Sequence, residues 1–164
     1  AARACKATGV PISTHSWAPE RVGEQQVRIF EDEGVDPNRV YIGHSNDSAD
    51  LDYLLGLLRR GVWLGLDRFP GENYPGTPRR EQRMEMVKRL LDAGWGHRVM
   101  LSHDWSAALT AGNAEIRAER DQRNPDRYLF ITRKVLPRLR ELGATEAAIR
   151  EMTVDNPRRF FEGE

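Results

Sequence analysis

The sequence has only one cysteine, Cys5, so the chain cannot form an internal disulfide and cysteine usage indicates no redox compartment. It has no excess of either charge, because 25 basic residues balance 25 acidic ones. That balance gives no support for a nucleic-acid partner. The sequence also lacks any apolar run near the ~18 residues that a membrane-spanning helix needs. These absences favour a soluble protein without a membrane span, and we expect a cytoplasmic one.

Further absences bear on the organisation of the chain. No glycine-rich phosphate loop follows any apolar run, which counts against nucleotide binding. No linker or low-complexity tract interrupts residues 1–164, so we expect them to lie within one domain. The chain does not begin with methionine, and its first residues are typical of a helix that stops at Gly9. We therefore expect additional sequence before residue 1.

What the sequence does contain is a regular alternation of β-type and helical patterns. Four short aliphatic runs of the kind found in buried parallel strands begin at Val10, Val40, Val62 and Val99. Helical periodicity separates them, most clearly from Leu51 to Leu58, and a longer helix is indicated from 128 to 142. The polar stretch from Ser106 to Asp126 predicts an active-site loop. Alternation of this kind predicts a parallel sheet covered by helices, either doubly wound or closed into a barrel.

All four predicted strands end in polar residues, which favours the barrel, because there the carboxyl ends open onto one face. These ends read Thr14-His15-Ser16, Gly43-His44-Ser45, Asp67-Arg68-Phe69 and Ser102-His103-Asp104-Trp105. The imidazoles of His15 and His44 with the carboxylate of Asp104 are a usual ligand set for zinc or a similar ion. His103 neighbours Asp104 and is expected to point to the opposite face of its strand.

The motifs resemble the phosphotriesterases and the phosphotriesterase-like lactonases. The matching stretches cover nearly the whole chain in order: PISTHSW, GEQQVRIFEDEGVDPNRVYIGHSND, WLGLDRFP, LSHDW and VDNPRRFF. They correspond to the second half of such an enzyme. The resemblance implies a TIM (β/α)8 barrel of which residues 1–164 supply about strands 5 to 8, their helices and the C-terminal helices. The N-terminal half of this single hydrolase domain would lie outside the sequence, and a homodimer is the implied assembly.

The resemblance also implies a binuclear metal centre of the amidohydrolase superfamily. His15 and His44 would bind one divalent ion and Asp104 the other. The ions are expected to be zinc, with cobalt, manganese or iron as alternatives. Family members take their remaining ligands, an H-x-H pair and a carboxylated lysine, from strands that this sequence does not contain.

Three catalytic residues follow from the resemblance. Asp104 would take the proton when a hydroxide that bridges the two ions attacks the substrate. Some relatives pass that proton to a histidine where this chain has Arg68, and arginine does not carry protons near neutral pH. Arg68 is therefore expected to position the substrate or to orient Asp47. Asp47 resembles a family aspartate behind the metal ligands, with helix capping as the alternative.

The same reasoning predicts a substrate pocket and leaves three functions open. The aromatic residues just beyond strand ends are expected to line an apolar pocket, with plain packing as the alternative for each: Trp17, Phe69, Tyr74 and Trp105. Hydrolysis of phosphotriesters, of the aryldialkylphosphatase type, is the first interpretation, because Ser102-His103-Asp104-Trp105 resembles the phosphotriesterases proper. A lactonase acting on acyl-homoserine or other lactones is the second. A noncatalytic half-barrel that needs a partner segment or a second copy is the third.

Overall fold

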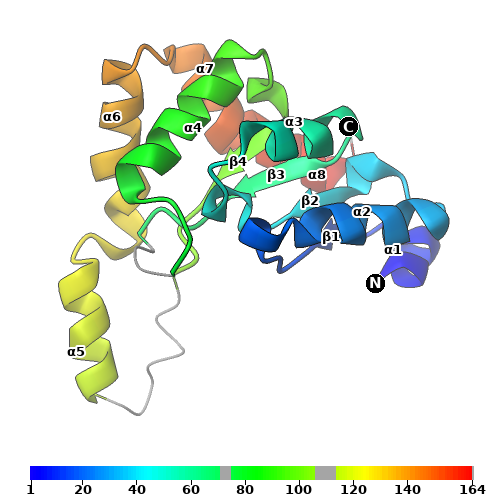
Figure 1. Ribbon diagram of the computed structural model, residues 1–164, viewed down its shortest axis with the longest axis horizontal. Helices are drawn as coiled ribbons and strands as arrows, with labels where there is room; N and C mark the ends of the chain where they lie inside the picture. The colour runs from blue at the N-terminus through cyan, green and yellow to red at the C-terminus, as the bar shows by residue number, and fades with distance from the viewer. Residues whose placement is uncertain (71–74, 106–113, 164) are drawn as a thin grey trace.

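The computed structural model describes residues 1–70, 75–105 and 114–163. Its four strands form one parallel sheet in chain order, as Figure 1 shows. They are β1 (Ile12–Ser13), β2 (Val40–Ile42), β3 (Trp63–Leu66) and β4 (Val99–Leu101). The parallel α/β arrangement expected from the sequence is therefore confirmed, whereas the assignment to strands 5 to 8 of a barrel stays a prediction.

The register of the strands separates the sheet into two faces. Tyr41 pairs with Trp63, and Gly65 pairs with Met100, so these four residues lie on one face. Residues of the intervening positions, such as Leu64, point to the other face because side chains alternate along a strand. The sheet thus has one face that carries Tyr41 and one that carries the aliphatic residues.

Helices cover the aliphatic face and build the main core there. They are α2 (Val22–Asp32), α3 (Leu51–Arg59) and α4 (Arg80–Asp92), which lie along the same side of the sheet in Figure 1. Val27, Leu57 and Leu90 from these helices are fully buried with Ile42 and Leu64. Gly61 and Gly94 follow α3 and α4 with φ of 86° and 83°, the left-handed conformation expected of a glycine that ends a helix.

A different helix packs on the face that carries Tyr41. Helix α8 (Asn156–Glu162) places Phe160 in a second, smaller cluster with Trp63 and Met100. The Asn156 side chain is fully buried and donates hydrogen bonds to the carbonyl oxygens of Gly96 and Val99, both at 2.8 Å. The C-terminal helix is therefore fastened to the start of β4.

The remaining elements connect these layers. Helix α1 (Ala2–Thr8) precedes β1, and the 3-10 turns are η1 (Ala18–Glu20), η2 (Pro37–Arg39), η3 (Ser45–Asp47), η4 (Gly96–Arg98) and η6 (Arg127–Leu129). Two π-helical turns, η7 (Ile131–Val135) and η8 (Glu151–Asp155), run directly into α6 (Leu136–Glu141) and α8, and η8 itself follows α7 (Glu146–Arg150). In the described part of the chain, every helix is too short or too polar to span a bilayer.

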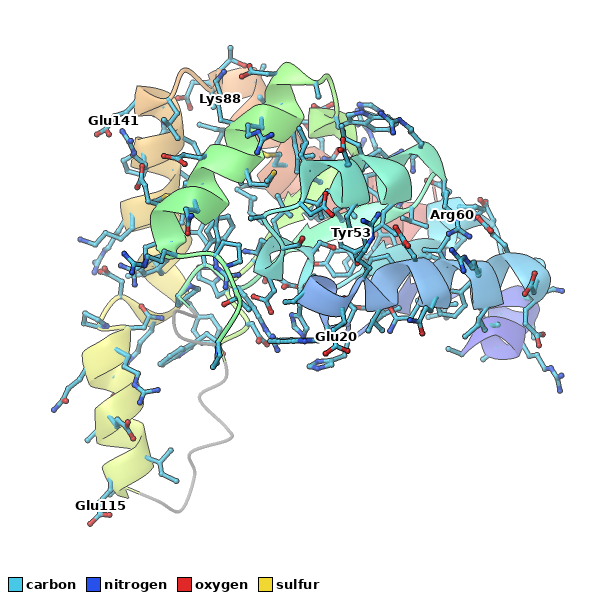
Figure 2. The ribbon with its side chains drawn as sticks, viewed as in Figure 1. Glu20, Tyr53, Arg60, Lys88, Glu115 and Glu141 are labelled. Atoms are coloured by element: carbon cyan, nitrogen blue, oxygen red, sulfur yellow. The ribbon has the colours of Figure 1, made fainter. Side chains whose placement is uncertain are left out.

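The prediction of a loop from Ser106 to Asp126 is wrong for residues 114–123, and its first part, 106–113, lies outside the described residues. Residues 114–123 form helix α5 (Ala114–Arg123), which projects away from the sheet with Glu115 near its far end (Figures 1 and 2). Its sequence AEIRAERDQR consists largely of strong helix formers but has one large apolar residue, Ile116. A helix without an apolar stripe gives no periodic signal, so the pattern could not reveal it.

Candidate metal centre

Two of the three predicted ligands meet at the carboxyl ends of β1 and β2. The Nε2 atom of His44 lies 2.8 Å from the Nδ1 atom of His15. The two rings are nearly perpendicular, with centroids 4.5 Å apart and an interplanar angle of 82°. His44 is buried and His15 is exposed, so the paired nitrogens lie at the edge of the protein core.

A glycine allows this close approach. A Cβ at Gly43 would lie 2.2 Å from the carbonyl oxygen of Thr14, a distance that real Cβ atoms do not show. The strand ends are also tied together, because the hydroxyl of Ser16 donates to the carbonyl oxygen of Gly43 at 2.6 Å. His44 then adopts a left-handed φ of 60° as the chain turns into η3. The motif Gly43-His44 thus positions the imidazole through its backbone.

Asp67, at the end of β3, orients the His44 ring and was not among the predicted site residues. Its Oδ1 atom accepts the backbone N–H of His44 at 2.9 Å and lies 2.9 Å from the ring Nδ1. An ionised carboxylate can only accept hydrogen bonds, so His44 donates from Nδ1, and its Nε2 then accepts the Nδ1 proton of His15. The sequence feature that could have identified Asp67 is its position next to Arg68 at the end of a predicted strand.

Asp104 lies in the same cavity but has a different partner. The cavity has a volume of about 450 Å³, and its walls include His44, Asp67 and Asp104. The Oδ2 atom of Asp104 accepts a hydrogen bond from Arg68 Nε at 2.9 Å. Among the described residues, no three His, Cys, Asp or Glu side chains lie close enough together to hold one ion. The structure therefore brings His15 and His44 together, while Asp104 lies on the wall of the cavity that His44 also lines.

Arg68 links the exposed carboxylate of Asp104 to the buried carboxylate of Asp47. Its NH1 atom donates to Asp47 Oδ2 at 2.7 Å, while Arg83 NH1 donates to Asp47 Oδ1 at 2.6 Å. Burial opposes the charged form of Arg68, but its bonds to Asp47 and Asp104 outweigh burial and raise its pKa. Arg68 therefore stays a cation and orients both carboxylates.

Asp47 does not cap a helix. The N-cap of α3 is Asp50, whose side chain accepts the backbone N–H of Tyr53 at 3.0 Å. Asp47 has no exposed surface and is neutralised by two arginines, which is the arrangement that makes a buried carboxylate tolerable. Arg83 was not predicted from the sequence, because an arginine in a helix is usually solvated.

The predicted substrate residues divide into three groups. Phe69 is fully buried in the main hydrophobic core, so the packing alternative applies to it. Trp17 and Trp105 are partly buried, and their place in a substrate pocket stays a prediction. Tyr74 lies outside the described residues. Apolar walls of the 450 Å³ cavity come instead from Met100 and, among others, the C-terminal residues Phe160 and Phe161.

His103 is bonded to the part of the chain that follows α5. Its Nε2 atom accepts the backbone N–H of Ile131 at 3.3 Å, which connects the end of β4 to the start of η7. Burial lowers the pKa of His103. The neutral ring is the form that can accept this bond, so the structure gives His103 a role in holding the chain after α5.

Comparison with known proteins places these features in one family. The sequence model of the phosphotriesterase family matches residues 1–161. The solved structure of the phosphotriesterase from Mycobacterium tuberculosis superposes with a TM-score of 0.83 at 40% identity, covering 98% of this chain and 48% of that one. An aryldialkylphosphatase of Saccharolobus solfataricus is 33% identical over 161 residues, which is 98% of this chain and 50% of that protein.

Similarity extends to a protein that is named for a different activity. An N-acetyltaurine hydrolase of Dictyostelium discoideum is 28% identical over 172 residues, covering 98% of this chain and 43% of that protein. The relatives with named activities are thus hydrolases of more than one kind of bond. The chain spans about half the length of the curated relatives that it matches.

Proposed function

The chain belongs to the phosphotriesterase family, and from this premise we propose that residues 1–164 form the C-terminal half of a metal-dependent hydrolase that cleaves phosphotriesters. The observation that carries the proposal is the pair of facing nitrogens, His44 Nε2 and His15 Nδ1, at 2.8 Å. A proton on His44 Nδ1, held by Asp67, leaves Nε2 in the form that binds a metal, and an ion held by both rings would replace the proton that His15 Nδ1 shares with Nε2.

The remaining half of the site would come from other strands of the same barrel. The four described strands are parallel and in chain order, as consecutive strands of a (β/α)8 barrel are. The chain also spans about half the length of its relatives. Both observations support a barrel in which an additional segment supplies four more strands and the other metal ligands.

The donor set suits zinc or a similar divalent ion. Two imidazole nitrogens and a carboxylate oxygen are donors that zinc accepts, and the carboxylate of Asp104 is accessible on the wall of the same cavity. Two such ions would lower the pKa of a water molecule and polarise the phosphoryl oxygen of the substrate. His15 and His44 would hold one ion, and Asp104 would contribute to the other.

Asp104, Arg68 and Asp47 would accept the proton or orient the proton acceptor in the proposed reaction. Asp104 would accept the proton released during hydrolysis, because it is the partly exposed carboxylate of the cavity. Arg68 holds one oxygen of Asp104 and remains protonated, so it orients the proton acceptor without taking the proton itself. Asp47 in turn holds Arg68 in place.

A direct test uses the full-length protein with measured metal content. We expect about two zinc ions per active site, and turnover of paraoxon that is lost on chelation and restored by added zinc. A kcat/KM for an acyl-homoserine lactone far above that for paraoxon would instead identify a lactonase. A fully folded protein that retains no metal and hydrolyses neither substrate would reject the hydrolase proposal.

A further inference from the structure

Tyr41 lies on β2 and contacts the candidate site through Asp67. It is the central residue of β2, and its hydroxyl donates a hydrogen bond to Asp67 Oδ2 at 3.0 Å. This is the carboxylate whose other oxygen holds both the backbone and the ring of His44. Tyr41, Asp67 and His44 thus form a continuous chain of contacts from β2 through the end of β3 to a candidate metal ligand.

The neighbouring strand leaves room for the tyrosine ring. Gly65 lies on β3, on the same face of the sheet as Tyr41. A Cβ at Gly65 would lie 2.2 Å from both Cζ and Oη of Tyr41, so any larger residue there would displace the ring. The absence of a side chain at Gly65 is what lets the hydroxyl reach the end of β3.

The C-terminal helix contacts the same ring. The centroid of the Phe160 ring lies 5.9 Å from that of Tyr41, at an interplanar angle of 45°. Phe160 is buried, and its backbone carbonyl is itself held by Arg39. Tyr41 is therefore restrained by packing from α8 as well as by the strand beside it.

The bond from Tyr41 restricts the carboxylate of Asp67. A carboxylate held through one oxygen can still turn about its terminal torsion, which is broad in energy. Bonds at both oxygens remove that freedom and fix the direction in which Asp67 holds the His44 ring. Burial and the neighbouring Asp67 carboxylate raise the pKa of Tyr41 well above its usual value, so the hydroxyl keeps its proton and remains a donor.

We propose that Tyr41 is a positioning residue for the metal ligand His44 and acts through Asp67, with Gly65 providing the space that this requires. The role in metal binding rests on the proposed function, whereas the orientation of the His44 ring does not. The inference concerns residues that contact no substrate, so it predicts an effect on metal retention and on kcat and no effect on KM.

The test compares two tyrosine hydroxyls in the full-length protein. Tyr41→Phe removes only the oxygen that contacts Asp67. Tyr53→Phe is the matched control, because Tyr53 is fully buried on α3, where Figure 2 labels it, and its hydroxyl lies beside Gly23 rather than Asp67. Both variants retain an aromatic ring at a buried or half-buried position, so both are expected to fold.

Two readouts are independent of catalysis. In Tyr41→Phe we expect the dissociation constant for zinc, measured by competition with a chromophoric chelator, to rise about tenfold. In metal-free protein at neutral pH, we expect the ring ¹⁵N signals of His44 to shift away from those of the Nδ1-protonated tautomer. The kcat for the substrate found active should fall with KM unchanged, and Tyr53→Phe should match the wild type throughout.

The outcomes separate this proposal from the proposed function. Zinc affinity within about twofold of wild type, together with unchanged His44 signals, would overturn the role of Tyr41. A wild-type protein that binds no zinc would overturn the proposed function, and the His44 signals would then still decide whether Tyr41 orients the ring. An equal loss of zinc affinity in Tyr53→Phe would also overturn the role of Tyr41, because a general loss of packing in the fold would then explain the weaker binding.

Discussion

His44 is held by Asp67 through both its backbone amide and its ring, so Asp67 controls the orientation of one candidate ligand. We expect Asp67→Ala to weaken zinc binding about 10- to 100-fold, because the freed imidazole can rotate and change tautomer. Isothermal titration of metal-free protein with zinc measures this effect. Asp52→Ala is the control, because Asp52 is an exposed carboxylate on α3 with no part in the proposed site. The zinc affinity of this variant should equal that of wild type.

Asp104 is the proton acceptor in the proposed hydrolysis. Asp104→Ala should lower kcat by about 100-fold or more, because it would remove the proposed proton acceptor and the proposed metal ligand together. Steady-state kinetics on metal-loaded protein checks the prediction. A variant that keeps near-normal kcat would refute the role assigned to Asp104.

The neighbouring histidine provides the contrast. His103→Gln should retain kcat within about threefold of wild type, because a glutamine oxygen can replace the ring nitrogen that accepts the Ile131 N–H. A loss as large as that of Asp104→Ala would place His103 in the reaction and would contradict its assignment as a residue that anchors η7.

At the scale of elements, Arg83 fastens α4 to the turn after β2. Its Nε atom donates to the Pro78 carbonyl, and its NH1 atom donates to the Asn46 carbonyl as well as to Asp47. Arg83→Met would leave the buried Asp47 carboxylate with one cationic partner and two carbonyls without this donor. We expect a loss of about 3–5 kcal/mol in the free energy of unfolding, measured by urea denaturation of the full-length protein.

A second arginine on α4 serves as the control for this prediction. Arg89 is exposed in the last turn of the helix, so Arg89→Met should change the free energy of unfolding by less than about 0.5 kcal/mol. Equal destabilisation by the two substitutions would show that the helix, and not the bonds to Asp47, accounts for the effect.

At the scale of the whole molecule, the described sheet has β1 and β4 at its edges. Edge strands offer unpaired backbone groups to other chains, and the cavity beside Phe160 and Phe161 exposes apolar surface. We expect residues 1–164 expressed alone to self-associate. Light scattering coupled to size-exclusion chromatography measures the mass, and a stable monomer of 18.8 kDa would contradict this expectation.

The sequence by itself determined the features that are local in the chain. The alternation of strands and helices follows from short-range apolar periodicity, and Gly61 and Gly94 end α3 and α4 in the left-handed conformation that glycine adopts readily. The family follows from motifs at the strand ends, each of which is a contiguous stretch. His15 and His44 could be named in advance, because parallel strands bring consecutive carboxyl ends to the same edge.

Only the tertiary structure decided which side chains pair across elements. The bond of Asp67 to His44, the reach of Tyr41 past Gly65 and the burial of Arg83 each depend on strand register or on helix packing. The sequence carries no local signal for such contacts, because their members are about 20 or more residues apart. Phe69 likewise lies in the core and not in the predicted pocket. The direction of its side chain depends on the backbone conformation just after β3, which the sequence does not reveal.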